Sequence, residues 1–254
     1  MIRLVGVLLW VNGRIVQTEN FHVTNTIHEH PIHAVEAIEA EDLDELAIIN
    51  ITGDVSSKEP FVNHIRDLAR GLRIPLIAGG QISNVSDFKQ LLNVGADKII
   101  CNTAVIDDPA LVETAVETYG SATVVASVDL SATLAEKIGN SRIYHNRLRK
   151  PISFTLDSWL HRQKELGIGE IFFNNVEHDG ARIGYDLKGL QHVMENSNSP
   201  VIAFGGVGDW SHLAEGVDIG AGAVAFGNAL HYVETAPRKA KLFLKRNGYA
   251  IREI

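Results

Sequence analysis

Two glycine pairs about half a chain apart are the residues best suited to binding an anion. Gly79 and Gly80 end one apolar segment, and Gly205 and Gly206 end another, with Gly205 lying 126 positions after Gly79 (205 − 79). Small residues after a strand let backbone N–H groups approach an anion closely. We therefore expect two related phosphate-binding loops, although glycine after a strand is also a common turn residue.

A second apolar strand follows each glycine pair and ends in residues that could complete the same loop. The first ends at Asn102 and Thr103, and the second at Gly227 and Asn228. Helices predicted to begin near residues 85 and 210 would add the positive ends of their dipoles. This doubled arrangement favours a ligand with phosphates at two sides of one barrel mouth. A further turn, at Asp179 and Gly180, either faces a phosphate or is a plain loop.

Asp129 is the best candidate for proton transfer. It ends the apolar segment 124–129, and burial beside anions would raise its pKa toward neutral pH. The alternative is a structural aspartate that caps a loop. The corresponding position of the first half is Leu9, 120 positions earlier (129 − 9), so the symmetric carboxylate is missing.

Four charged residues stand at the starts of predicted strands, and they include two of each sign. They are Arg3, Glu45, Lys98 and Glu170. Such a set can close into a ring of ion pairs at the bottom of a barrel. Spacing alone favours a stabilising plug, because that face of a barrel usually serves stability.

The elements that must position these residues follow from eight apolar segments that alternate with eight amphipathic ones. This pattern is typical of parallel strands covered by helices. We expect strands to begin near residues 4, 46, 75, 98, 123, 170, 200 and 223, and helices at 32–41, 59–72, 85–94, 109–119, 157–166, 187–196, 210–219 and 236–247. The sequence thus predicts a (β/α)8 TIM barrel built from two duplicated half-barrels, about 1–120 and 121–254, in a single domain, 1–254. Two long connections, 11–30 with a turn at Asn12-Gly13 and 130–156, would lie at the rim of the active face.

Composition excludes several classes of protein. With 31 acidic and 23 basic residues the net charge is −8, which argues against nucleic-acid binding. The single cysteine, Cys101, rules out an internal disulfide, fits a cytoplasmic location and suggests a buried thiol. Residues 1–10 are apolar but too short for a targeting or membrane segment. His28, His30 and His33 could hold a divalent ion, but a second cluster is missing, so we expect no metal and no cofactor.

With these residues in place, the chain resembles, along nearly its whole length, the family of cyclase subunits of imidazole glycerol phosphate synthase. The matching motifs are Asn12-Gly13-Arg14, Asp44-Glu45-Leu46, Gly95-Ala96-Asp97-Lys98, Asn102-Thr103-Ala104, His178-Asp179-Gly180, Gly184-Tyr185-Asp186 and Gly205-Gly206.

The resemblance implies a duplicated barrel that receives ammonia from a glutaminase partner docked on its N-terminal face. The family uses the ammonia to cleave and cyclise a bisphosphorylated ribonucleotide. The resemblance places phosphate sites at Asn102, Thr103, Asp179, Gly180, Gly206, Gly227 and Asn228. It also aligns the four strand-start charges with the family's ammonia gate, so a gate becomes the favoured interpretation of the ring.

The active face departs from the family at four positions. Leu9 replaces the first of two catalytic aspartates, whereas Asp129 matches the second. Gln17 replaces a loop lysine, Gln81 a third glycine, and Asn50 a strand-two aspartate. Loss of an acid-base group commonly lowers the rate about a hundredfold or more.

These departures are similar to those of sugar-amidation paralogues of the cyclase, which carry an apolar residue at the first aspartate position. The leading hypothesis is therefore an ammonia-channelling synthase subunit of a glutamine amidotransferase complex, acting on an acetamido sugar for surface polysaccharide, with a phosphorylated or nucleotide-sugar substrate. The first alternative is an imidazole glycerol phosphate synthase cyclase that tolerates Leu9. The second is a non-catalytic scaffold that activates a glutaminase.

Overall fold

Eight parallel strands form a closed barrel in the computed structural model, which describes residues 1–31, 35, 42–131 and 137–252. They are β1 (Arg3–Val11), β4 (Glu45–Asn50), β5 (Leu76–Gly79), β6 (Lys98–Cys101), β7 (Val124–Ser131), β10 (Glu170–Asn175), β11 (Val201–Ala203) and β12 (Ala223–Phe226). Neighbours pair in chain order, β12 pairs with β1, and β7 pairs with β10. The predicted barrel is confirmed, and every predicted strand start lies within one residue of the observed one.

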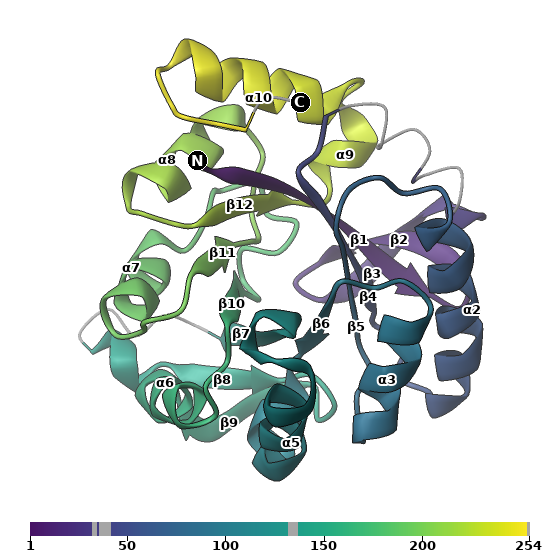
Figure 1. Ribbon diagram of the computed structural model, residues 1–254. Coiled ribbons are helices and arrows are strands. Elements are labelled where there is room, and N and C mark those ends of the chain that lie inside the picture. Colours follow the sequence, from purple (N-terminus) through teal and green to yellow (C-terminus); the bar gives the residue numbers. More distant parts are fainter. Residues whose placement is uncertain (32–34, 36–41, 132–136, 253–254) are drawn as a thin grey trace.

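Helices surround the barrel on its outside (Figure 1). The long ones are α2 (Lys58–Ala69), α3 (Val85–Asn93), α5 (Pro109–Tyr119), α6 (Leu156–Glu165), α7 (Leu187–Glu195), α8 (Trp210–Asp218) and α10 (Ala236–Arg246). Seven of the eight predicted helices are thus confirmed, while the helix predicted at 32–41 falls almost wholly outside the described residues. Shorter helices are α4 (Thr103–Asp107), α9 (Ala229–Tyr232), and the 3-10 turns η1 (Val55–Ser57), η2 (Ser121–Thr123) and η3 (Ile138–Asn140).

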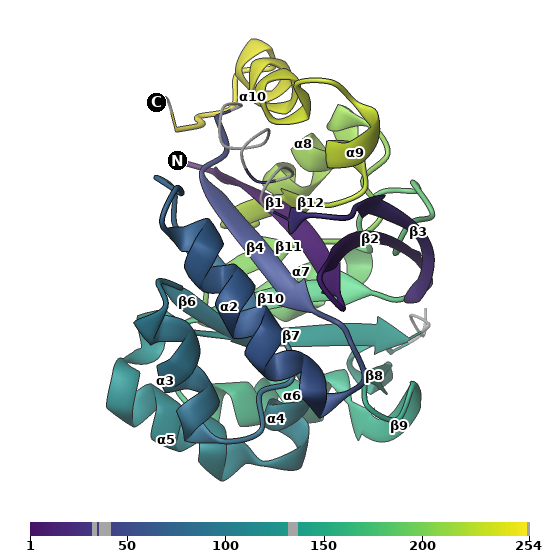
Figure 2. The same cartoon turned by 90° about the vertical axis from the view of Figure 1, so that its right-hand side faces the viewer.

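The two long connections form antiparallel hairpins. The first contains β2 (Arg14–Glu19) and β3 (His22–His28), and the second contains β8 (Arg142–His145) and β9 (Lys150–Thr155). The predicted turn at Asn12-Gly13 is confirmed, with positive φ angles of 47° and 89° that suit Asn and Gly. Figure 2 shows both hairpins at the end toward which the strand arrows point, with the chain termini on the opposite side.

Alternation along the strands divides the apolar residues into two cores. On β1, Leu4, Leu8 and Trp10 face the surrounding helices, whereas Val5 and Val7 face the barrel interior. The interior cluster comprises Val5, Val7, Ala47, Ile77, Ile100, Val125, Phe172, Ile202, Phe204, Ala223 and Ala225. By the same alternation, inward-facing residues at the strand starts and strand ends gather at the two ends of the barrel. They form a charged site at the N-terminal end and a polar site at the C-terminal end.

No helix among the described residues is both long and apolar enough to cross a membrane. Cys101 is buried, as predicted, and burial raises the pKa of its thiol.

Candidate functional site

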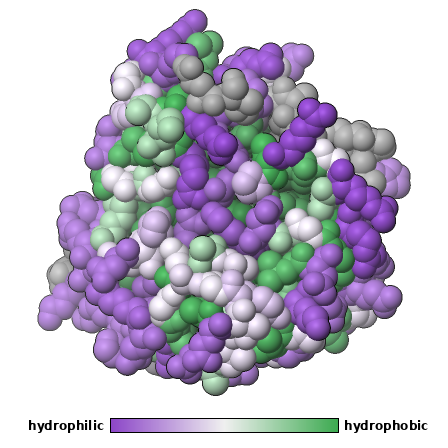
Figure 3. All heavy atoms as spheres, in the orientation of Figure 1, coloured by the Kyte–Doolittle hydropathy of each residue, from purple (hydrophilic) through white to green (hydrophobic). Residues whose placement is uncertain are grey.

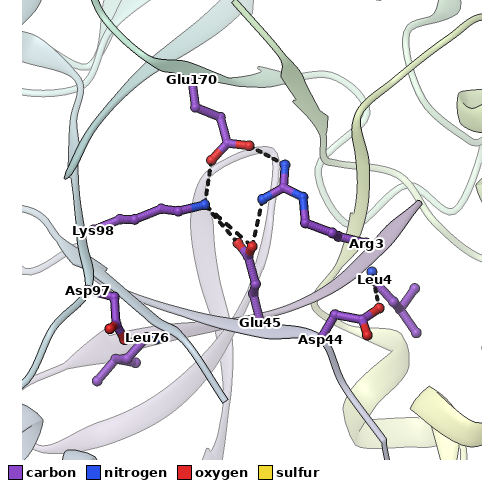
Figure 4. A network of polar contacts seen from close by, with 8 residues as sticks. All are labelled: Arg3, Leu4, Asp44, Glu45, Leu76, Asp97, Lys98 and Glu170. Atoms are coloured by element: carbon purple, nitrogen blue, oxygen red, sulfur yellow. Dashed lines mark hydrogen bonds and ion pairs between the residues drawn. The ribbon is translucent and has the colours of Figure 1, made fainter. Parts of the chain in front are cut away.

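The four predicted strand-start charges close into a ring at the N-terminal face of the barrel (Figure 4). Arg3 donates from Nη1 to Glu45 at 2.6 Å and from Nη2 to Glu170. Lys98 Nζ lies 3.2 Å from Glu45 Oε2 and 2.9 Å from Glu170 Oε2. Each carboxylate therefore contacts both cations, and each cation contacts both carboxylates.

The two acids of the ring are buried, whereas its two bases are partly exposed. The two glutamates are each 6% exposed, whereas the side chains of Arg3 and Lys98 are 25% and 21% exposed. Burial of the acids makes loss of one cation costly, because a buried carboxylate would lose half of its charged partners. The two cations are the parts of the ring that a protein docked on this face could reach.

The surroundings of the ring are mixed in polarity, and the strand starts beside it are anchored. Figure 3, drawn from the same side as Figure 1, shows hydrophilic side chains near the centre of this face with apolar side chains among and around them. Asp44 fixes the start of the neighbouring strand: it accepts the N–H of Leu4 at 2.7 Å and the ammonium of Lys241 at 2.8 Å. The ring is thus held by strand ends that are themselves anchored.

Asp129 lies at the opposite end of the barrel, on the inward side of β7. It is 5% exposed, and burial is the main reason that its pKa is raised to about 6, with a smaller contribution from the charge of Asp179. Hydrogen bonds from Asn146, Asn102 and Asn174 oppose this rise. A carboxyl with a pKa near working pH can both release and accept a proton, which is what general acid-base chemistry requires.

The predicted phosphate residues of the second half come together around one pocket. Asp179, Gly180, Gly205, Gly206, Gly227 and Asn228 all line a hollow of about 460 Å³, counted with its open mouth. Arg182 and His231 line it too. Burial, together with the charge of His28, lowers the pKa of His231 to about 4, so the imidazole is neutral at pH 7. Arg182 therefore supplies positive charge to this pocket, and His231 can supply only a neutral N–H.

Glycines of both candidate phosphate loops are needed by the fold as well. Gly205 has φ 93°, and a Cβ there would lie 2.1 Å from Asn174 Oδ1. Gly80 has φ 98°, and its Cβ would lie 2.0 Å from the carbonyl oxygen of Asn50. Close packing and left-handed backbone thus account for the glycine pattern without any ligand.

Asp179 has protein partners of its own. Its Oδ2 accepts the N–H of Phe21 at 2.9 Å, and its carbonyl accepts the N–H of Asn20 at 3.0 Å. These bonds tie the β2–β3 turn to the loop that follows β10. Burial raises the pKa of Asp179, and a carboxylate beside a phosphate is electrostatically unfavourable. Its direct contribution in the structure is therefore to shape the pocket.

The predicted phosphate residues of the first half lie at the ends of β5 and β6, away from the pocket just described. Gly79 ends β5 and Gly80 follows it, while Asn102 precedes α4 and Thr103 begins it. Asn102 has other partners: its Nδ2 donates to Asp129 Oδ2 at 2.8 Å and to the carbonyl oxygen of Ser127 at 3.3 Å. The candidate phosphate sites of the two halves therefore differ, as the presence of Gln81 in the loop of the first half suggested.

Leu9 lines the pocket of the second half and faces the barrel mouth. It lies beside Ile49 of β4 and Val16 of β2, so its surroundings are apolar. This position brings no proton-transfer group to the mouth, and Asp129 is left without a symmetric partner.

The other two departures have structural explanations. Gln17 accepts a hydrogen bond from the hydroxyl of Tyr232, which joins the β2–β3 hairpin to the end of α9. Asn50 lies on the outward side of β4 with Leu46 and Ile48, donates to Ser57 Oγ at 3.0 Å and accepts the N–H of Thr52 at 2.9 Å. The amide of Asn50 thus closes the loop that follows β4.

Sequence reasoning missed two partners of Asp129. Asn174 was detectable, because it continues the inward alternation of Glu170 and Phe172 on β10. Asn146 was not, because it reaches Asp129 from the tip of the β8–β9 hairpin. Among the described residues no group of three metal-binding side chains comes together, and His33 lies outside them.

Comparisons with known proteins find relatives along nearly the whole chain. A family described as "Histidine biosynthesis protein" matches residues 3–236. The imidazole glycerol phosphate synthase subunit HisF of Streptomyces coelicolor is 34% identical over 251 residues, which cover 99% of this chain and 98% of the relative. The chain therefore belongs to the histidine biosynthesis protein family, among its HisF-like cyclase subunits.

Proposed function

We propose that this chain is the ammonia-accepting synthase subunit of a glutamine amidotransferase, with a glutaminase subunit docked on its N-terminal face. The observation that carries the proposal is the ring of Arg3, Glu45, Lys98 and Glu170. It closes the end of the barrel where the strands begin, and Asp129 lies at the end where they finish. Between them the interior is lined by apolar side chains, through which neutral ammonia passes more easily than ammonium or water.

The ring acts in this proposal as a gate that a docked partner opens. Its cations are exposed enough to be contacted from outside, whereas its acids are not. Moving Lys98 aside would leave both glutamates paired through Arg3 alone, so the closed state is favoured until a partner offers replacement contacts.

The pocket beside Leu9 is the proposed binding site for a phosphate of the substrate. Backbone N–H groups of the glycine loops, Asn228 and the guanidinium of Arg182 are its suitable donors. Asn102 and Thr103, with Gly79 and Gly80, are proposed as the weaker site of the first half.

Two reactions fit this arrangement, and different observations favour each. The similarity to HisF supports cleavage and cyclisation of a bisphosphorylated ribonucleotide, and it does so more directly than any observation supports amidation. Leu9 favours amidation of an acetamido sugar, because a leucine cannot transfer a proton and the cyclase reaction relies on two carboxyls. A scaffold without catalysis has less support, since Asp129 keeps a pKa suited to proton transfer.

An assay of the purified chain with the bisphosphorylated ribonucleotide and a high concentration of ammonium separates the two. Turnover that is lost in Asp129→Asn establishes the cyclase reaction. If turnover occurs only in Leu9→Asp, the missing carboxyl is the reason and the amidation proposal stands. Absence of turnover in both proteins, when each still binds inorganic phosphate, also favours amidation.

A further inference from the structure

The tip of the β8–β9 hairpin reaches the reacting carboxyl through one side chain. Asn146 Nδ2 donates to Asp129 Oδ2 at 2.6 Å and to Asn102 Oδ1 at 2.9 Å. Asn102 Nδ2 donates to the same Oδ2 of Asp129 at 2.8 Å. An amide group has two N–H donors, so both donors of Asn146 are used and its orientation is fixed.

The residues on both sides of Asn146 are held by a single carboxylate. His145 is 3% exposed, and its Nε2 donates to Asp107 Oδ1 at 2.9 Å. Arg147 Nη1 lies 3.1 Å from Asp107 Oδ2. His145 Nδ1 also accepts the N–H of Leu148 at 3.2 Å, which closes the turn and specifies the tautomer with its proton on Nε2.

One short helix connects the two ends of this arrangement. Asn102 immediately precedes α4, and Asp107 is its last residue. The helix therefore contacts Asp129 at its beginning and clamps the hairpin turn at its end, so that Asn146 is held between two points of the same rigid element. The neighbouring Tyr144 packs edge-on against Phe21 of the other hairpin, with ring centres 5.5 Å apart.

We propose that Asn146 is a positioning residue that holds the carboxylate of Asp129 at the barrel mouth, and that His145 and Asp107 clamp the turn that carries it. The proposal deepens the proposed function, because it takes Asp129 as the reacting group. Its physical basis is that a buried carboxylate needs donors to remain ionised and oriented. The side-chain donors here are neutral amides, and within the described part of the chain the charge that acts on Asp129 is that of Asp179.

Removing Asn146 takes away a donor that favours the ionised carboxyl. Burial and the charge of Asp179 both raise the pKa of Asp129, and fewer hydrogen bonds then oppose them. The pKa of Asp129 is therefore higher in Asn146→Ala. We expect a rise of about one pH unit, the size of one hydrogen bond to a charged group. In Asn146→Asp a second carboxylate replaces the donor, and the rise should be larger.

The test is a pH titration of aspartate carboxyl carbons by NMR in the full chain labelled with ¹³C, with Asp129→Asn used to assign the signal. His145→Phe keeps a ring but removes both ring hydrogen bonds, so it should raise the Asp129 midpoint by less than Asn146→Ala does. Ser153→Ala, at an exposed position of β9, is the matched control and should leave the midpoint unchanged.

An Asp129 midpoint that stays in place or falls in Asn146→Ala and Asn146→Asp would overturn the positioning role. A midpoint unchanged in His145→Phe would overturn the clamp. The titration needs no substrate and no partner chain, so its failure can be told apart from failure of the proposed function.

Discussion

Replacing Asp129 by asparagine should stabilise the fold at neutral pH. The carboxyl is 5% exposed and its pKa is raised to about 6, mainly by burial. A raised pKa means that the folded chain holds the proton more tightly than the unfolded chain does. The ionised carboxylate therefore costs stability, and an amide of the same shape avoids that cost.

The magnitude follows from the pKa shift. The difference between about 6 and the ordinary value of 3.8 is about 2.2 units, equivalent to about 3 kcal/mol at 1.36 kcal/mol per unit. Folding is favoured by the protonated carboxyl below pH 3.8, and this advantage is lost as the pH rises through about 6. The gain of Asp129→Asn should thus be about 3 kcal/mol at pH 7.5 and about half of that at pH 5.

Urea unfolding of both proteins at pH 5, 6 and 7.5 measures this gain. An equal slope of the unfolding free energy against urea concentration shows that both proteins expose the same surface area on unfolding. Activity should be lost in the same variant. If the stability difference does not grow between pH 5 and pH 7.5, or if the variant is less stable than the parent at pH 7.5, the ionised carboxylate of Asp129 does not cost the fold stability.

The other stability predictions concern single contacts. Lys241→Met leaves the carboxylate of Asp44, which is 2% exposed, without its ammonium partner; we expect a loss of about 3 kcal/mol in urea unfolding, against little change in the exposed control Lys239→Met. Gly205→Ala adds a Cβ 2.1 Å from the amide oxygen at the end of β10, whereas Gly220→Ala meets nothing within 4 Å at a similar φ. The first should cost at least about 2 kcal/mol more than the second, and equal costs would mean that only the backbone angle matters.

The barrel was predictable because its signals are local. Strand starts, helix ranges and the Asn12-Gly13 turn follow from alternation, amphipathic spacing and glycine, and each is fixed by a few neighbouring residues. The ring was predictable for a related reason: Arg3, Glu45, Lys98 and Glu170 occupy the same place in their strands, so a closed barrel brings them together.

The mouth was less predictable because its contacts cross long stretches of chain. The two excursions were expected as loops, and their folding into hairpins depends on pairing with β1 and β7. Asn102 was assigned to phosphate binding from its place after a strand, but in the structure its amide donates to Asp129. That contact depends on the inward direction of both side chains, and on Asn146 arriving from another element.

In the proposed function the N-terminal ring admits ammonia from a docked glutaminase. The ratio of glutamine-driven to ammonium-driven turnover in the assembled complex measures this passage. Lys98→Met leaves Asp129 and the pocket unchanged, since they lie at the other end of the barrel. Lys98 is one of the two ring cations that a docked partner can contact, so without it the partner lacks a contact through which it aligns and opens the ring. We predict that this ratio falls about tenfold or more in Lys98→Met and stays unchanged in Lys239→Met, corresponding to at least about 1.4 kcal/mol in the passage step. An equal loss of both activities in Lys98→Met, or no loss of either, would contradict the account.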